Sequence, residues 1–238
     1  MAIQLKNGEV FFAVPKTGST HVYRILDELG LIQKPSTHKH ANFEYLLSYE
    51  PQFLFNRTIE PRNLKRGTSI FGISPKNVPS FMFVRDPLTW LESYYSYSKQ
   101  RGLRKWGNGS GIQGQNLKRY YWHPWRELMQ CPMESFDGFI EGVINHCPGY
   151  VSRMYFSYIM NEHTLIGRQE ELITDLTLIL QHYDYQINNL DSLIPQKSNE
   201  SKKNIVWNEE LKSAIRTLES PYYSFDWNSR LRNQIKQS

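Results

Sequence analysis

Short runs of apolar residues alternate along the chain with segments in which apolar residues recur at helical spacing. Residues 10–14 (VFFAV) and 81–84 (FMFV) are uninterrupted apolar runs, as expected of strands buried on both faces of a sheet. A third strand is predicted at 164–167. Helices are predicted from apolar residues three or four positions apart at 21–30, 135–145 and 170–182. This alternation predicts an α/β fold with a central parallel sheet flanked by helices.

A polar turn, Pro15-Lys-Thr-Gly-Ser-Thr20, joins the first predicted strand to the first predicted helix. Its glycine permits a tight turn, and Ser19 or Thr20 is expected to cap the helix. A helix start presents backbone N–H groups and the positive end of the helix dipole, and Lys16 adds a cation. The turn therefore predicts a binding site for a phosphate-like anion.

This turn differs from the phosphate loop of nucleotide kinases and other NTPases. In that loop a lysine directly follows the second glycine, whereas here Lys16 precedes Gly18. A strand ending in a magnesium-binding aspartate is also not evident, because Arg85 separates Asp86 from the apolar run before it. The sequence therefore disfavours a magnesium-dependent phosphoryl transferase.

A second anion contact is predicted where the strand 81–84 ends. Arg85 follows the strand directly, and Ser93 lies about two helical turns further on. Ligands of open α/β sheets bind at the carboxyl ends of strands, so Arg85 and Lys16 are expected to flank one crevice. The alternative is that Arg85 pairs with Asp86 or another carboxylate.

Together, Pro15–Thr20 and Val84-Arg-Asp-Pro87 followed by Ser93-Tyr-Tyr95 resemble the two anion motifs of the sulfotransferase superfamily, in particular its carbohydrate-type and bacterial members. Residues 166–176 and 222–227 resemble later segments of the same superfamily. The resemblance implies a P-loop-like, three-layer fold. It also implies transfer of a sulfuryl group from PAPS (3′-phosphoadenosine 5′-phosphosulfate) to an acceptor hydroxyl, with adenosine 3′,5′-bisphosphate as the other product.

The resemblance also assigns cofactor contacts to individual residues. The 5′-phosphosulfate would be held by Pro15, Lys16, Thr17, Gly18, Ser19 and Thr20. The 3′-phosphate would be held by Arg85 and Ser93, and Lys197 begins a late basic loop that loosely resembles a further nucleotide contact. Trp90 stands where many members have a basic residue.

Sulfuryl transfer needs a charge stabiliser on the leaving oxygen and a base for the acceptor hydroxyl. Lys16 is the candidate stabiliser, and no metal is expected because cations of the protein already hold the leaving nucleotide. Histidine suits a base near neutral pH, and two lie in the loop after the first helix. His40 is the first candidate, His38 the second and Glu44 the third. The alternative is that both histidines are merely solvent-exposed.

Residues 94–126 are predicted to bind the acceptor, partly through a mobile, glycine-rich loop. The segment contains no Asp or Glu, and its basic residues are interleaved with Tyr and Trp. Cations suit an anionic acceptor and flat rings suit sugar faces, so we expect an anionic saccharide, then a small phenol or alcohol, then a peptide tyrosine. The alternatives to a sulfotransferase are a nucleotide-binding protein without a working base and a nucleotide kinase.

The length and net charge of the chain agree with the interpretation as a sulfotransferase. The 238 residues are expected to form one domain, and the net charge of +5 suits a polyanionic cofactor. The sequence contains no nucleic-acid-binding signature, no apolar stretch near the ~20 residues of a membrane span and no signal peptide, so a cytoplasmic protein is expected. The oligomeric state is not predicted.

Two cysteines, Cys131 and Cys147, bracket the predicted helix 135–145. They lack metal-ligand spacing with the nearby histidines, so no metal site is inferred. Reduced thiols are expected in the cytosol, and a bridge in an oxidising compartment.

Overall fold

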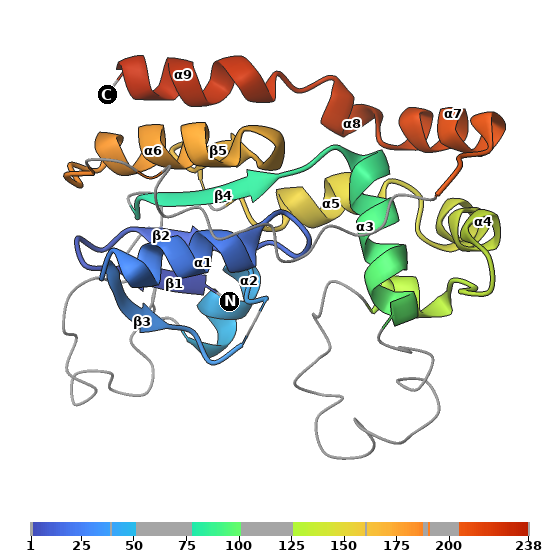
Figure 1. The fold of residues 1–238 in the computed structure, drawn as a ribbon, viewed down its shortest axis with the longest axis horizontal. Coiled ribbons are helices and arrows are strands. Elements are labelled where there is room, and N and C mark those ends of the chain that lie inside the picture. Colours follow the sequence, from blue (N-terminus) through green and yellow to red (C-terminus); the bar gives the residue numbers. More distant parts are fainter. Residues whose placement is uncertain are drawn as a thin grey trace, which may run out of the picture. The chain divides into compact units, whose positions relative to one another are not determined.

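The computed structural model describes residues 2–38, 40–50, 78–100, 126–159, 161–187, 190 and 205–237. Figure 1 labels the elements along the chain. The chain divides into two compact units, each described by itself below. The first unit contains Met1–Val84, Tyr155–Pro195 and Trp227–Ser238, and the second contains Arg85–Met154 and Gln196–Asp226.

The first unit is built on a mixed sheet of five strands. These are β1 (Ala2–Leu5), β2 (Val10–Phe12), β3 (Ile32–Pro35), β4 (Ser80–Val84) and β5 (Leu165–Arg168), in the order β3-β1-β2-β4-β5. Strand β4 lies parallel to both β2 and β5, with Phe11 opposite Phe81 and Met82 opposite Ile166. The predicted α/β class and the three predicted strands are confirmed.

The prediction of a purely parallel sheet is wrong, because β1 pairs antiparallel with both β2 and β3. Only residues 6–9 connect β1 to β2, and the Leu5 N–H donates to the Glu9 carbonyl at 2.8 Å across this turn. A parallel crossover needs about a dozen residues, so such a short turn can only form a hairpin. The hairpin and β3 give the parallel strands an antiparallel extension on the β2 side.

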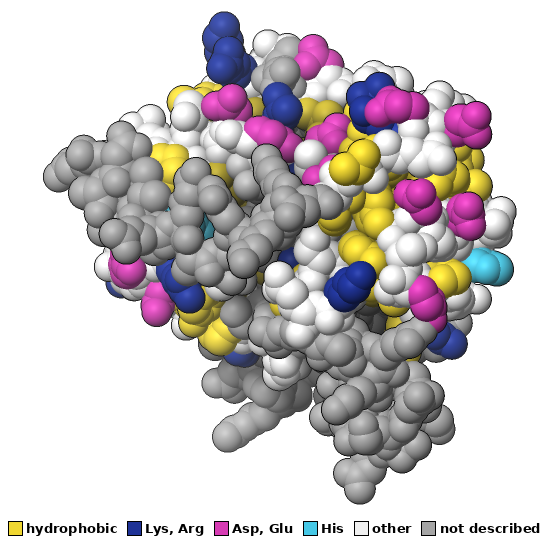
Figure 2. Space-filling view, turned by 45° about the vertical axis from the view of Figure 1, so that its right-hand side comes forward, with side chains coloured by type: hydrophobic (Ala, Val, Ile, Leu, Met, Phe, Trp, Pro, Cys, Tyr) yellow, Lys and Arg dark blue, Asp and Glu magenta, His cyan; other side chains and the backbone are white. Residues whose placement is uncertain are grey.

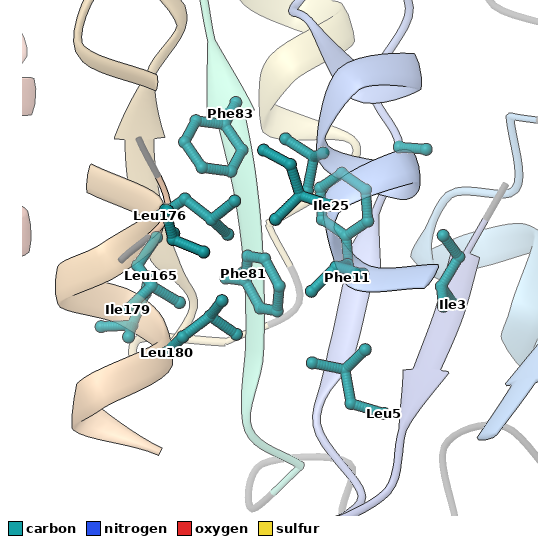
Figure 3. Close-up of a cluster of buried hydrophobic side chains, with 14 of the residues drawn as sticks. Ile3, Leu5, Phe11, Ile25, Phe81, Phe83, Leu165, Leu176, Ile179 and Leu180 are labelled. Atoms are coloured by element: carbon teal, nitrogen blue, oxygen red, sulfur yellow. The ribbon is translucent and has the colours of Figure 1, made fainter. Parts of the chain in front are cut away.

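One face of the sheet is covered by α1 (Ser19–Glu28), α6 (Leu172–His182) and α9 (Trp227–Gln237). Alternate strand residues point to this face, among them Phe11 and Phe81, whose rings stack with centroids 5.0 Å apart. Figure 3 shows these rings and Phe83 between Ile25 of α1 and the apolar side of α6. The predicted helices at 21–30 and 170–182 therefore supply much of this core.

The remaining elements of the first unit are α2 (Phe43–Tyr49) and the short 3-10 helix η7 (Gln169–Glu171). Asn42 caps α2 by accepting the Tyr45 N–H at 2.9 Å. Phe12 points away from the large core and meets the ring of Tyr158 edge-on, with centroids 6.1 Å apart. Both faces of β2 are thus buried, as its continuous apolar run predicts.

The second unit is helical. It contains α3 (Pro87–Gln100), the 3-10 helix η6 (Glu127–Gln130), α4 (Phe136–His146), the start of α5 (Tyr150–Phe156), α7 (Glu209–Leu218) and α8 (Ser220–Tyr223). Its core is aromatic: Trp90 is fully buried and stacks on Tyr94, which stacks in turn on Phe139. Trp90 is therefore a packing residue of α3, which accounts for the apolar side chain at this position.

A buried carboxylate joins two helical segments of the second unit. Glu219 is fully buried, and its two carboxylate oxygens accept the N–H groups of Val151 and Ser152 at 2.9 and 2.7 Å. Burial raises the pKa of Glu219, while these hydrogen bonds oppose the rise. Because the first N–H groups of a helix have no partner within it, Glu219 serves as a cap for α5. None of the helices in the described part of the chain is long and apolar enough to span a membrane.

Candidate functional site

The predicted anion loop, residues 15–20, joins β2 to α1 in the first unit. Lys16 and Gly18 both have left-handed backbones, with φ of +64° and +79°. Glycine adopts this conformation freely, but a lysine rarely does. Thr17 is 1% exposed, and its hydroxyl donates to the Val14 carbonyl at 3.0 Å. The Thr17 hydroxyl therefore shapes the loop from inside, and the backbone N–H of Thr17 is the candidate ligand contact.

Helix α1 begins without a side-chain cap. Gly18 occupies the cap position, so the prediction that Ser19 or Thr20 caps the helix is wrong, and both residues lie in its first turn. The N–H groups of His21 and Val22 donate to the Gly18 carbonyl at 2.8 and 3.1 Å. The N–H groups of Ser19 and Thr20 precede any acceptor within the helix, and no acidic residue occupies the first turn. The start of α1 is thus suited to an anion.

His40 lies beside the strand that leads into this loop. It is 7% exposed, so the alternative of a solvent-exposed residue does not hold for it. Its Nδ1 is 3.4 Å from the carbonyl oxygen of Ala13, two residues before Pro15. A carbonyl can only accept, so in this contact Nδ1 carries the proton and Nε2 is the basic nitrogen of the neutral ring.

The backbone of His40 is held at both its N–H and its C=O group. Its N–H donates to Nδ1 of His38 at 3.2 Å, and its carbonyl accepts the hydroxyl of Tyr158 at 2.9 Å. Tyr158 is 1% exposed, and burial raises the pKa of its phenol, which stays a hydrogen-bond donor. The imidazole of His40 is therefore attached to a fixed backbone rather than to a freely moving loop.

His38 is a weaker candidate for the base. Burial lowers its pKa to about 4, and its Nδ1 already accepts the His40 N–H. The segment before it is anchored as well, because the Ser36 hydroxyl donates to the His38 carbonyl at 3.0 Å and the Thr37 N–H donates to Glu50 at 3.1 Å. Glu44, the third candidate, is exposed in the first turn of α2.

Arg85 belongs to the second unit and precedes α3. Its Nε donates to the hydroxyl of Thr89 at 3.0 Å, and that hydroxyl donates to the Asp86 carbonyl at 3.0 Å. This chain of hydrogen bonds fixes the direction of the guanidinium relative to the first turn of α3. Ser93, the other predicted 3′-phosphate contact, lies further along α3 and is 7% exposed.

The carboxylate of Asp86 has a structural role in the same turn. One oxygen accepts the N–H groups of Leu88 and Thr89 at 3.0 and 3.2 Å, and the other accepts the hydroxyl of Tyr223 at 3.1 Å. The carboxylate beside the predicted phosphate contact Arg85 thus serves as the cap of α3.

The two predicted motifs start from neighbouring parallel strands. The loop follows β2, and Arg85 is the next residue in the chain after Val84, where β4 ends. Lys197 and residues 101–125 of the predicted acceptor segment lie outside the described residues. On the face shown in Figure 2, acidic, basic and apolar side chains of the described residues are interspersed.

Two residues around the candidate site were not indicated by the sequence. Thr89 lies one helical turn after Arg85, and this i, i+4 spacing in the sequence is a signal that predicts a contact between the two side chains. Tyr158 is 118 positions from His40, and no local pattern connects the two.

Comparison of the chain with models of protein families, with curated proteins and with solved structures finds no match. The assignment of a function therefore depends on the anion loop, the buried His40 and the Arg85 segment of this chain.

Proposed function

We propose that this protein is a sulfotransferase that uses PAPS as donor, with an anionic carbohydrate as the first acceptor class to test. One observation carries the proposal. The start of α1 has no side-chain cap, follows the left-handed residues Lys16 and Gly18, and comes after a strand exit that the buried His40 contacts. In this proposal β2, the loop and α1 correspond to the strand, phosphate loop and helix of a P-loop-like fold.

The reaction needs one bond to form and one to break. The acceptor hydroxyl oxygen attacks the sulfur of PAPS, and the bond from sulfur to the 5′-phosphate oxygen breaks, in line with the attack. Nε2 of His40 takes the proton of the acceptor hydroxyl, and the hydrogen bond from Nδ1 to Ala13 orients the ring. Lys16 neutralises the charge that grows on the leaving phosphate oxygen.

The remaining contacts hold the nucleotide. The backbone N–H groups of Thr17, Gly18, Ser19 and Thr20 hold the 5′-phosphate. Arg85, which Thr89 orients, holds the 3′-phosphate together with Ser93. This division explains why a loop suited to one anion and an oriented arginine follow two neighbouring parallel strands.

A calorimetric titration tests the cofactor assignment. Adenosine 3′,5′-bisphosphate should bind the full chain in the presence of a metal chelator, and Lys16→Ala and Arg85→Ala should each weaken the binding. ATP binding that requires magnesium, without binding of the bisphosphate, would show a nucleotide kinase and refute the proposal.

A turnover assay tests the catalytic part. His40→Ala should lower sulfuryl transfer roughly 10²–10⁴-fold while bisphosphate affinity is retained. His163→Ala is the matched control, because 66% of that side chain is exposed. If PAPS binds but no sugar, sulfated oligosaccharide, phenol or tyrosine peptide is sulfated, the chain is a nucleotide-binding protein and not an enzyme.

A further inference from the structure

The two cysteines of the chain meet inside the second unit. Cys131 directly follows η6, and Cys147 directly follows α4. Their sulfur atoms lie 3.8 Å apart, in hydrogen-bond contact, and the residues are only 5% and 1% exposed. They are the only cysteines in the chain, so no other thiol competes for either of them.

A glycine on α4 makes this approach possible. A Cβ atom at Gly142 would lie 2.9 Å from Cβ and 3.0 Å from Cα of Cys131, and 2.7 Å from Cδ of Pro132. Any side chain at this position would push the Cys131–Pro132 segment away from the helix. The pairing therefore depends on backbone contact and not on the chance orientation of two side chains.

The backbone at each cysteine is held by a hydrogen bond. The Cys131 N–H donates to Leu128 at 3.1 Å, and the Cys147 N–H donates to Val143 at 3.0 Å. A disulfide has its sulfur atoms about 2.05 Å apart, so the present 3.8 Å leaves a gap of about 1.8 Å to close. Rotation about the χ1 angles of the two cysteines moves their sulfur atoms by distances of about this size.

We propose that Cys131 and Cys147 form a reversible intramolecular disulfide that links the end of η6 to the end of α4. The oxidant is a small-molecule disulfide such as glutathione disulfide. The thiolate of Cys131 attacks one sulfur of the oxidant, the S–S bond of the oxidant breaks and one glutathione leaves. The sulfur of Cys147 then attacks Sγ of Cys131 and releases the second glutathione.

The stoichiometry balances. Two protein thiols lose two electrons and two protons, and one glutathione disulfide becomes two glutathione thiols. Cys131 is the residue that reacts first, because a hydrogen bond from Cys147 lowers the pKa of Cys131, while the same contact raises the pKa of Cys147.

The test is a redox titration of the full chain in mixtures of reduced and oxidised glutathione. Equilibrium is approached by refolding the reduced, denatured chain, so that burial of the thiols does not limit the reaction. After acid quenching and alkylation, mass spectrometry should show one product, a monomer lighter by two hydrogen atoms. At equal glutathione poise, the ratio of disulfide to dithiol should be about a hundred-fold higher in buffer than in urea, as expected when the fold holds a short loop closed.

Controls make the titration decisive. Cys147→Ser should yield only the glutathione adduct of Cys131. Gly142→Ala should lower the ratio of disulfide to dithiol in buffer towards the ratio measured in urea. A ratio that is equal or lower in buffer than in urea would overturn the proposal, and so would a stable glutathione adduct or a disulfide-linked dimer of the unmutated chain.

Discussion

Gly18→Ala tests the anion loop with a control that the same helix provides. Both ends of α1 carry a glycine in the left-handed conformation, Gly18 with φ +79° before the helix and Gly30 with φ +63° after it. The left-handed conformation costs an alanine about 1–2 kcal/mol. A Cβ atom at Gly30 meets nothing within 4 Å, and at Gly18 its nearest contact is a methyl group of Leu172 at 3.2 Å, the flexible end of a side chain.

Both substitutions should therefore destabilise the fold by similar amounts. At a cost of about 1–2 kcal/mol, the thermal midpoint of a chain of this size falls by roughly 2–8 °C. Only Gly18→Ala, however, changes the peptide groups that precede α1. Loss of one hydrogen bond to a charged phosphate costs about 1.5–3 kcal/mol, so the affinity for adenosine 3′,5′-bisphosphate should fall roughly 10- to 100-fold.

The assay is a pair of measurements on each variant, the thermal midpoint and the calorimetric affinity for the bisphosphate. Gly30→Ala should lose stability and keep its affinity, whereas Gly18→Ala should lose both. Unchanged affinity in Gly18→Ala would show that the anion does not bind at this loop. Equal loss of affinity in both variants would show that general destabilisation is the cause.

Three further predictions concern single positions. Gly167→Ala should lower the free energy of unfolding by about 1–3 kcal/mol, because the new Cβ atom would lie 2.6 Å from the fully buried ring of Phe83. A urea midpoint equal to that of the wild type would contradict this packing. The depressed pKa of His38, about 4 against 6.5 in the unfolded chain, predicts stability that is present above pH 6.5 and lost as the pH falls towards 4. Because solvent screens the half-exposed ring, the expected loss of unfolding free energy is about 1–2 kcal/mol. Urea titrations at pH 7 and pH 5 should show this difference in the wild type and lack it in His38→Asn. Lys16→Gly should leave the free energy of unfolding unchanged or raise it by up to about 1 kcal/mol, and should still weaken bisphosphate binding. A clear loss of stability would show a structural role for the lysine.

The elements that the sequence predicted are those whose residues are apolar for local reasons. The strands β2, β4 and β5 are short buried runs, and α1, α4 and α6 carry apolar residues at helical spacing. Strands β1 and β3 lack such a signal. Ala2–Leu5 contains Gln4 and is buried because it lies between two other strands, and Ile32–Pro35 is largely exposed and is a strand because it pairs with β1. The antiparallel pairing of β1 with β2 depends on the short turn at residues 6–9, and the spacing of apolar residues does not indicate this turn.

The candidate site also has features that the local sequence predicts and features that it does not. The position of Lys16 and Gly18 between a strand and a helix follows from the local pattern, but the left-handed backbone of Lys16 does not, because lysine does not favour it. The burial of His40 depends on contacts with residues distant in the chain, among them Tyr158. The family resemblance indicates only that many members have a basic residue at the position of Trp90, whereas the structure shows Trp90 fully buried and stacked on Tyr94.

The backbone of Lys16 links the fold to the proposed chemistry. A left-handed residue other than glycine costs about 1–2 kcal/mol, and replacing it by glycine removes that cost. The next glycine in the loop, Gly18, shows that this turn accommodates glycine in the left-handed conformation. The backbone cost at position 16 is therefore offset by a contribution of the lysine side chain that glycine lacks, and the proposed contact with an anion is one such contribution. A positive charge at the exit of a buried strand and ahead of an uncapped helix strengthens the same field that the helix start creates. The left-handed backbone of Lys16 therefore favours the proposed anion site at this loop, since strained residues cluster at ligand-binding sites.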